Sequence, residues 1–161
     1  MKERTRNRFI KRNIAIGMLL GMLLNNLTFA NELIKTRDGS TARVITAPNG
    51  TPMIELVNPN GSGISVNDFD RLSVDEKNLI LNNISPKEGA GYRSELGGII
   101  APNENYTGNP ARAVLIRVHK DPSVINGFIE AASTSRVDMI FSNPNGLYIN
   151  GGLVGRFGDV T

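Results

Sequence analysis

The chain has 161 residues, with 18 Lys and Arg against 15 Asp and Glu, a formal net charge of +3 and one histidine, His119. It has no cysteine, which excludes a disulfide scaffold, a thiolate metal site and a cysteine nucleophile. Tryptophan is absent and aromatic residues make up only 6%, which argues against stacking platforms for single-stranded nucleic acid. No metal site and no cofactor are predicted. The 19 Asn and 17 Gly favour many short elements joined by turns.

The first thirty residues have the three parts of a secretory signal peptide. Residues 1–13 hold six basic residues and one acidic residue, and the uncharged apolar run Ile14–Leu24 follows. Thr28 and Ala30 then place small residues at the −3 and −1 positions of a cleavage site before Asn31. The pattern predicts a leader that engages the general secretion machinery and is removed after Ala30. A short membrane anchor is the alternative, but the apolar run is well below the ~20 residues that a spanning helix needs.

The positive charge of the chain belongs to this leader. Without residues 1–30 the sequence has 12 basic and 14 acidic residues, so the mature part, residues 31–161, is slightly acidic. Nucleic acid is therefore not an expected partner. We expect a product that is exported through the periplasm and is either secreted or held at the cell surface.

The mature part is expected to be β throughout. Its apolar runs are short, rich in Ile, Val and Leu, and bounded by Gly, Pro and Asn. The expected strands are Ala42–Thr46, Met53–Val57, Asn78–Leu81, Gly97–Ile100, Ala113–Val118, Val137–Phe141 and Leu147–Ile149. Phe69–Lys77 fits neither the helical nor the strand period, and we interpret it as an extended stretch that ends in a turn.

One phrase recurs, an apolar run closed by Pro-Asn-Gly. It occupies residues 45–50, 56–61 and 141–146, with a degenerate copy at 100–103. Proline fixes φ at roughly −65° at the second position of a type I turn, asparagine tolerates the third position, and glycine accepts positive φ after it. Repeated strand–corner–strand units favour a solenoid whose coils stack and whose corner asparagines form ladders. The competing interpretation is that Pro-Asn-Gly is a good turn in any fold.

Eight segments of the mature part follow one another in the order found in a known family. They are Val57–Gly61, Gly63–Asp70, Leu79–Asn83, Leu96–Ile100, Gly108–Ala111, Pro122–Glu130, Val137–Leu147 and Ile149–Gly152. This ordered set, spread over residues 33–161, resembles the N-terminal secretion domain of the filamentous haemagglutinin family. That family comprises the large exoproteins of Gram-negative two-partner secretion, among them adhesins, haemolysins and contact-dependent inhibition toxins.

The resemblance implies an all-β fold, a right-handed parallel β-helix with an N-terminal cap. It also implies a function as a secretion-targeting and structural module rather than an enzyme. The implied partner is a dedicated outer-membrane transporter, a β-barrel with periplasmic polypeptide-binding domains. The transporter recognises the domain in the periplasm, and the exoprotein crosses it unfolded and folds at the cell surface.

Two family turn motifs carry over as candidate transporter-recognition sites. The Asn-Pro-Asn-Gly-Ile motif matches Asn143, Pro144, Asn145 and Gly146. Leu147 follows in place of Ile, which keeps an apolar residue after the turn.

The Asn-Pro-Asn-Leu motif corresponds to Asn103, Glu104, Asn105 and Tyr106. Glu104 stands where the family has proline, and glutamate is tolerated at the second position of a type I turn. The remaining copy of the phrase is expected to be a structural turn formed by Asn58, Pro59, Asn60 and Gly61.

Family exoproteins are far longer than this chain. Residues 31–161 are therefore expected to be a partial secretion domain that comes from a fragment, a truncated reading frame or a split gene. In that case a host-cell or neighbouring-cell surface is the expected partner of a downstream region. A non-functional truncated remnant is an alternative interpretation.

A β-helical carbohydrate-active enzyme is the alternative from another functional class. Asp68, Asp70, Asp75 and Glu76 lie close together in the sequence, and paired carboxylates carry out acid–base catalysis in glycosidases. No basic or aromatic substrate-binding residues cluster with them, so a solvated acidic loop is the favoured interpretation. His119 has no nucleophile near it and is expected to lie on a surface strand.

Two strands are candidates for direct binding by the transporter. Ala113–Val118 and Val137–Phe141 are extended apolar runs of the kind that add to the sheet edge of a binding domain. The competing and favoured interpretation is that both runs form the ordinary core of the solenoid.

Overall fold

The computed structural model describes residues 33–161. The predicted leader and its cleavage site at Ala30 and Asn31 lie outside the described residues. No helix within residues 33–161 has the length and apolar character needed to cross a bilayer.

Two five-stranded sheets hold most of the strands. The first has the order β1 (Ile34–Thr36), β4 (Ile64–Leu72), β8 (Ala113–Val118), β11 (Val137–Ser142), β14 (Phe157–Val160). The second has the order β13 (Gly152–Gly155), β10 (Phe128–Ala132), β5 (Leu79–Asn82), β3 (Pro52–Glu55), β2 (Arg43–Thr46). A two-stranded sheet pairs β9 (Ser123–Ile125) with β12 (Leu147–Ile149), and Val74 forms an isolated bridge to Ile125.

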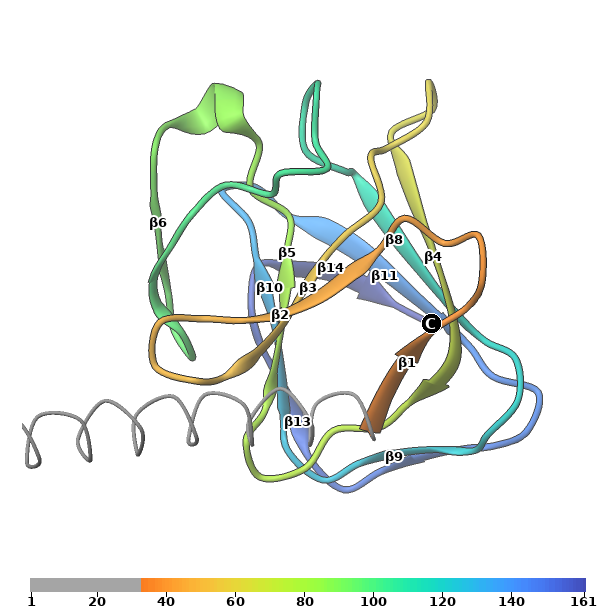
Figure 1. Ribbon diagram of the computed structural model, residues 1–161. Helices are drawn as coiled ribbons and strands as arrows, with labels where there is room; N and C mark the ends of the chain where they lie inside the picture. The colour runs from red at the N-terminus through yellow and green to blue at the C-terminus, as the bar shows by residue number, and fades with distance from the viewer. Residues whose placement is uncertain (1–32) are drawn as a thin grey trace, which may run out of the picture.

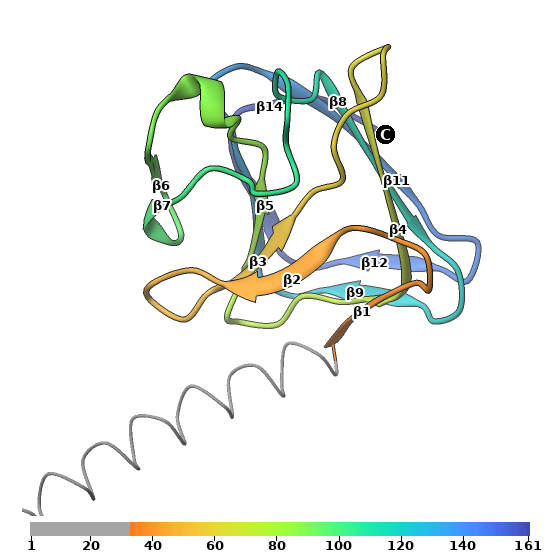
Figure 2. The ribbon, with the colours of Figure 1, turned by 45° about the horizontal axis from the view of Figure 1, so that its top comes forward.

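The chain visits these three sheets in turn and so winds into a three-sided coil (Figures 1 and 2). The first coil runs from β4 past Val74 to β5, the second from β8 through β9 to β10, and the third from β11 through β12 to β13. Neighbouring coils are parallel and in register, because Val66 pairs with Leu115 and Leu115 pairs with Ile140. The prediction of a β-helical solenoid is confirmed.

The two N-terminal strands close one end of the coil stack. β1 runs antiparallel to β4 and β2 runs antiparallel to β3, whereas the other pairs within the two large sheets are parallel. Covering an edge in this way removes a row of unpaired backbone groups that another chain would otherwise pair with. These strands form the N-terminal cap that the family resemblance implies.

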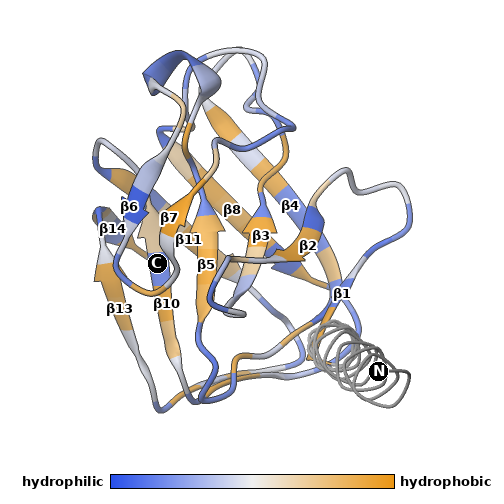
Figure 3. Ribbon diagram, turned by 60° about the vertical axis from the view of Figure 1, so that its left-hand side comes forward, coloured by the Kyte–Doolittle hydropathy of each residue, from blue (hydrophilic) through white to orange (hydrophobic). Residues whose placement is uncertain are grey.

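Strict alternation of side chains places the core inside the coil. In β8 the side chains of Val114, Ile116 and Val118 are buried, while Leu115 and Arg117 point outward. Figure 3 shows apolar residues concentrated on the strands and polar residues on the connections between them. Removing this apolar surface from water stabilises the fold by about 25 cal/mol per Å².

The strands expected from the apolar runs are all present. Ala113–Val118 and Leu147–Ile149 have the predicted bounds, and the other expected strands differ by one or two residues at their ends. Phe69–Lys77 is extended through the end of β4 and then turns before β5, as expected. The sequence analysis missed the first part of β4, residues 64–68, and the strands β1, β6 (Tyr92–Ser94), β9, β10, β13 and β14.

A β-hairpin interrupts the winding between the first and second coils. A 3-10 helix, Pro86–Glu88, leads into the antiparallel strands β6 and β7 (Gly98–Ile100). The hairpin packs against the second large sheet in a small apolar cluster of its own, made of Ala47, Met53, Ile80, Ile100 and Ala132.

The side chain of Glu130 anchors this hairpin. Glu130 lies on β10 and is fully buried, with 0% of its surface exposed. Its carboxylate accepts hydrogen bonds from the Ser94 hydroxyl at 2.6 Å and from the backbone N–H groups of Glu95 at 3.0 Å and Leu96 at 2.9 Å. A buried carboxylate requires such donors, since desolvation without them is costly. The hairpin tip is thus fixed to the second coil.

A repeated Asn-Gly corner sets how closely the coils approach each other. A Cβ atom on Gly127 would lie 1.9 Å from the carbonyl oxygen of Asp75, and one on Gly151 would lie 1.8 Å from the carbonyl oxygen of Gly127. Next to these glycines, Asn150 donates from Nδ2 to Oδ1 of Asn126 at 3.0 Å. This pair joins two Ile-Asn-Gly corners, whereas the sequence predicts an asparagine ladder at the Pro-Asn-Gly corners.

Apolar side chains are exposed at the far end of the coil stack. Leu153 pairs with the buried Ile129, and Val160 pairs with the buried Met139, so both occupy core positions in the register. They are nevertheless 43% and 47% exposed, because within residues 33–161 no further coil covers them. A following coil in the same register would bury this face.

We expect Glu130→Ala to loosen the hairpin, because it leaves one buried hydroxyl and two partly buried N–H groups without their acceptor. The cost is about 2–3 kcal/mol for hydrogen bonds to a charged group. Hydrogen exchange of the Glu95 and Leu96 amides should become faster, while Glu95→Ala, which removes an exposed carboxylate of the same hairpin, should leave it unchanged. Unaltered exchange in Glu130→Ala would contradict the anchoring role.

We expect Gly127→Ala to destabilise the domain, since the added methyl group meets backbone that cannot move aside. The expected cost is roughly 1–3 kcal/mol or more, measured by urea unfolding. Gly61→Ala is the matched control, because nothing lies within 4 Å of a Cβ atom at that position. Equal stability of the two variants would contradict the close approach of Gly127 to the backbone of Asp75.

Candidate functional site

The turn at Asn143–Gly146 connects β11 to β12 and is fastened to the preceding coil. The Gly146 N–H donates to the Asn143 carbonyl at 3.2 Å, and the Asn145 N–H donates to Oδ1 of Asn143 at 2.9 Å. Nδ2 of Asn143 donates to the Asp121 carbonyl at 3.0 Å and to the Ser123 hydroxyl at 2.8 Å, both in the second coil. One carboxamide thus closes its own turn with its oxygen and binds the neighbouring coil with its nitrogen.

The turn at Asn103–Tyr106 has the same pattern. The Tyr106 N–H donates to the Asn103 carbonyl at 3.1 Å, and the Asn105 N–H donates to Oδ1 of Asn103 at 2.9 Å. Nδ2 of Asn103 donates to the carbonyl oxygens of Leu56 at 3.0 Å and Asn82 at 2.9 Å. Asn103 is fully buried, so this residue joins the ends of β3 and β5.

Glu104 takes the position of the family's proline without changing the turn, as expected. Its N–H, which a proline would lack, donates to Oε1 of Glu55 at 3.3 Å. Its carboxylate pairs with Nη2 of Arg43 at 2.6 Å, and Nε of Arg43 donates to Oε2 of Glu55 at 3.0 Å. The backbone restriction that proline would supply is replaced by contacts with Arg43 on β2 and Glu55 on β3.

The other two residues of this turn are also engaged. Nδ2 of Asn105 donates to the carbonyl oxygens of Thr41 at 3.0 Å and of Glu55 at 3.2 Å. Tyr106 occupies the fourth position of the turn, where the family motif has an apolar residue, and it is 3% exposed. Its hydroxyl donates to Oδ1 of Asn83 at 2.8 Å. Burial raises the pKa of the Tyr106 hydroxyl, which stays protonated as a donor.

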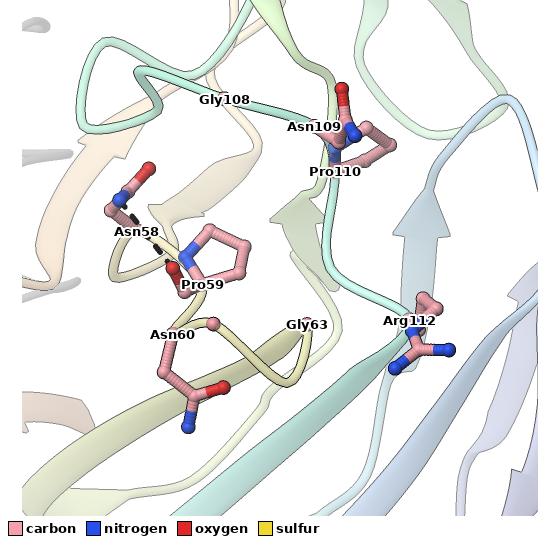
Figure 4. Close-up of a pocket in the computed structure, with 9 residues that line it drawn as sticks. Asn58, Pro59, Asn60, Gly63, Gly108, Asn109, Pro110 and Arg112 are labelled. Carbon is pink, nitrogen blue, oxygen red and sulfur yellow. Dashed lines mark hydrogen bonds between the residues drawn. The ribbon is translucent and has the colours of Figure 1, made fainter.

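The turn expected at Asn58–Gly61 is displaced along the chain. The structure places it at Asn60–Gly63, where the Gly63 N–H donates to the Asn60 carbonyl at 2.8 Å and Gly63 has φ of 75°. Oδ1 of Asn58 instead accepts the N–H of Thr107 at 3.0 Å, and its Nδ2 donates to the Pro59 carbonyl at 3.5 Å (Figure 4). Pro59 and Gly61 therefore do not hold the turn positions predicted for them. Asn60 closes the turn instead, because its Oδ1 accepts the N–H groups of Ser62 and Ile64.

The sequence analysis missed Asn83, which joins distant parts of the coil stack by hydrogen bonds as Asn103 and Asn143 do. Its Nδ2 donates to the Ala111 carbonyl at 3.0 Å and the Ser133 hydroxyl at 3.1 Å, and its Oδ1 accepts from the Tyr106 hydroxyl and the Ala111 N–H. All of its hydrogen-bonding capacity is used inside the protein. Asn83 follows an apolar strand without a proline beside it, so the Pro-Asn pattern did not identify it.

Two of the four acidic residues that suggested glycosidase chemistry, Asp68 and Asp70, form ion pairs. Oδ1 of Asp68 lies 2.8 Å from Nε of Arg117 and 2.7 Å from Nε2 of His119, and Asp70 accepts from Nζ of Lys120 at 2.6 Å. These hydrogen bonds from Arg117 and Lys120 hold the pKa values of Asp68 and Asp70 below their usual range. A glycosidase acid needs a raised pKa, so neither carboxylate suits that role.

The two proposed transporter-binding runs are central strands of the first sheet. β8 lies between β4 and β11, and β11 lies between β8 and β14. Both backbone edges are thus occupied in the folded domain, in agreement with the core interpretation.

We expect Asp68→Asn to make stability less dependent on pH in acid. The pKa of Asp68 is lower in the folded than in the unfolded chain, so its contribution is present above the unfolded value and is lost as pH falls through the folded value. At pH 7 the variant should lose about 0.5–1 kcal/mol, and near pH 2 it should match the wild type. Asp38→Asn, an exposed control, should unfold like the wild type at both pH values, and an equal loss at both would contradict the assignment.

Comparison with known proteins agrees with this geometry. The family model described as "TPS secretion domain" matches residues 32–153. The 16S rRNA endonuclease CdiA of Enterobacter cloacae is 33% identical over 155 residues, which are 94% of this chain and 4% of that protein. The hemolysin of Serratia marcescens is 31% identical over 120 residues, which are 74% of this chain and 7% of that protein. The chain thus spans a small fraction of these relatives.

A solved structure shares the fold. The filamentous hemagglutinin secretion domain superimposes with a TM-score of 0.68 at 27% identity, over 79% of this chain and 40% of that one. The coil topology, the two asparagine turns and the family match point to the same conclusion. The chain belongs to the TPS secretion domain family, the N-terminal secretion-targeting modules of two-partner-secreted exoproteins.

Proposed function

We propose that this chain is the segment by which an outer-membrane transporter selects its exoprotein, and that the transporter reads the segment before it folds. The observation that carries the proposal is the shared geometry of the two turns at 103–106 and 143–146. One of them keeps that geometry although its proline is replaced, as the hydrogen bonds of Asn103 indicate.

The burial of Asn103 is the reason to place recognition before folding. Both hydrogens of its carboxamide are used inside the protein and 0% of its surface is exposed. A partner therefore has no access to this side chain in the folded domain. In the extended chain the same carboxamide is solvated and available for binding.

Strands β8 and β11 support the same order of events. Their backbone groups are paired on both sides in the folded domain, whereas in an extended chain they are free to add to a sheet edge of the transporter's periplasmic domains. Folding on the far side of the outer membrane then withdraws both the strands and Asn103. Return of the chain through the transporter becomes unfavourable.

Two general properties suit a chain that is exported unfolded. It has no cysteine, so no disulfide locks it in the oxidising periplasm. A β-helix makes its contacts between neighbouring coils, so it can fold coil by coil as it emerges. We place the folded product at the cell surface or in the medium, and assign any toxic, adhesive or haemolytic activity, and any host-cell or neighbouring-cell partner, to other regions of the exoprotein.

The test is export of variants from cells that also make the transporter. Asn143→Ala and Asn103→Ala each remove an asparagine that fastens a turn to another part of the coil stack, and Asn145→Ala alters the third position of one turn. We expect severalfold less protein in the medium for each of them, with destabilisation of about 2–3 kcal/mol for the buried Asn103. Secretion is measured by immunoblotting of medium and periplasm.

Asn109→Ala is the control, because the Asn109 side chain makes no hydrogen bond to another residue within 33–161, and it should be exported like the wild type. Normal export of Asn143→Ala and Asn145→Ala would overturn the assignment of that turn as a recognition site.

A further inference from the structure

The sequence has five Asn-Gly pairs, and the folded domain treats one of them differently from the rest. In such a pair the glycine nitrogen can attack the asparagine carboxamide, because no Cβ atom obstructs its approach. Asparagine is for this reason a thermolabile residue, and the structure around each pair decides whether the reaction proceeds. The pairs are Asn49-Gly50, Asn60-Gly61, Asn126-Gly127, Asn145-Gly146 and Asn150-Gly151.

In four of the pairs the attacking nitrogen is held by a backbone hydrogen bond. The glycine N–H must lose its proton before the nitrogen can attack, and a hydrogen-bonded amide is protected from solvent until that bond opens. The bonds join Gly50 to Ala47 at 2.9 Å, Gly127 to Val74 at 3.3 Å, Gly146 to Asn143 at 3.2 Å and Gly151 to Ile125 at 2.8 Å. These four pairs are protected while the domain stays folded.

Asn60-Gly61 differs from them at both reacting groups. Within residues 33–161 the Gly61 N–H makes no hydrogen bond, and nothing lies within 4 Å of a Cβ atom built on this glycine. Nδ2 of Asn60, the group that would leave, has no acceptor among the described residues, whereas Nδ2 of Asn49 donates to the Leu96 carbonyl at 2.7 Å.

The Asn60-Gly61 pair is also open to water. Both residues are exposed, and they line a cleft of about 420 Å³ beside the start of β4. Figure 4 shows the Asn60 carboxamide pointing away from Asn109 and Pro110 on the facing wall of this cleft. Solvent therefore has access to the nitrogen that must lose a proton and to the carboxamide that must be hydrolysed.

The loop places two donors on the oxygen that would take up negative charge. Oδ1 of Asn60 accepts the N–H of Ser62 at 2.9 Å and the N–H of Ile64 at 3.1 Å. When the Gly61 nitrogen adds to Cγ, this oxygen becomes an oxyanion, and fixed backbone N–H groups stabilise such a charge. The turn keeps the donors in place, because the Gly63 N–H donates to the Asn60 carbonyl at 2.8 Å and the Asn60 N–H donates to the Ile64 carbonyl at 3.0 Å.

We propose that Asn60 is a modification site, at which the folded protein deamidates by forming a succinimide with Gly61. The Gly61 N–H gives its proton to a base in the solvent, and its nitrogen bonds to Cγ of Asn60. The Cγ–Nδ2 bond then breaks, and Nδ2 takes a proton from water and leaves as ammonia. Water opens the ring at Cγ to give aspartate, or at the backbone carbonyl to give isoaspartate.

The modification changes the folded product after export. Aspartate adds a negative charge to this loop, and isoaspartate reroutes the backbone through the side chain and breaks the turn before β4. The proposal goes beyond selection by the transporter, because the donors from Ser62 and Ile64 converge on Asn60 only in the folded domain. The loop would thus record how long the folded protein has been exposed to solvent.

The test is peptide mass spectrometry of the folded chain during incubation in mildly alkaline buffer, with isoaspartate detected by enzymatic methylation. We expect Asn60 to be converted to the acid severalfold faster than the asparagine of each of the other four pairs. Asn60 should also react faster in the folded chain than in a synthetic peptide of residues 56–66, because the peptide lacks the fixed donors.

Gly61→Ala should slow the reaction at Asn60 by roughly tenfold or more, since the added methyl group obstructs the approach of the nitrogen. Ser62→Ala is the control, because it keeps the backbone N–H that Oδ1 accepts, and it should react like the wild type. Unfolding midpoints confirm that both variants are folded. An equal rate at another Asn-Gly pair of the folded chain, or a rate in the peptide that equals or exceeds the rate in the folded chain, would overturn the proposal.

Discussion

This structure depends on one kind of interaction, in which the carboxamide of an asparagine binds the backbone of another part of the coil stack. A carboxamide carries both an acceptor and donors, so Asn103 and Asn143 each close a turn with the oxygen and fasten that turn with the nitrogen. Asn83 joins the loop 108–112 to the coil stack in a related way. Asn103 and Asn83 are buried away from water, so each of their polar groups left unpaired would cost about 1–3 kcal/mol. The abundance of asparagine in the sequence is therefore a property of the coil corners.

The same interaction couples folding to export. A side chain that must be buried in the folded domain is fully solvated in the unfolded chain, so Asn103 is accessible to a partner only before the domain folds. The N-terminal cap, formed by β1 and β2, leaves the opposite end of the stack as the place where coils can be added. There Leu153 and Val160 lie at core positions and remain exposed. A chain that folds from its cap outward would build each coil on the one before it.

Local signals in the sequence predicted short strands and sharp corners, and the family resemblance added the capped β-helix. Pro-Asn-Gly after an apolar run marks a corner, and Ala113–Val118 shows the alternation of a strand with one face in the core. What the sequence analysis missed depends on contacts between distant residues. The burial of Glu130 under the hairpin has no local signature, and Asn58 binds Thr107, which is 49 residues away in the chain. The repeated Ile-Asn-Gly at residues 125–127 and 149–151 marks the stacked corner, but it lacks the proline of the Pro-Asn phrase.

The central claim is that folding removes Asn103 and the backbone edges of strands β8 and β11 from the transporter. Its most direct test is the affinity of the transporter's purified periplasmic domains for the chain, measured immediately after dilution from urea and again after refolding is complete. The account predicts binding to the unfolded chain that declines in step with the folding signal, and earlier loss of binding under conditions that speed folding. Equal affinity for the fully folded chain would contradict it.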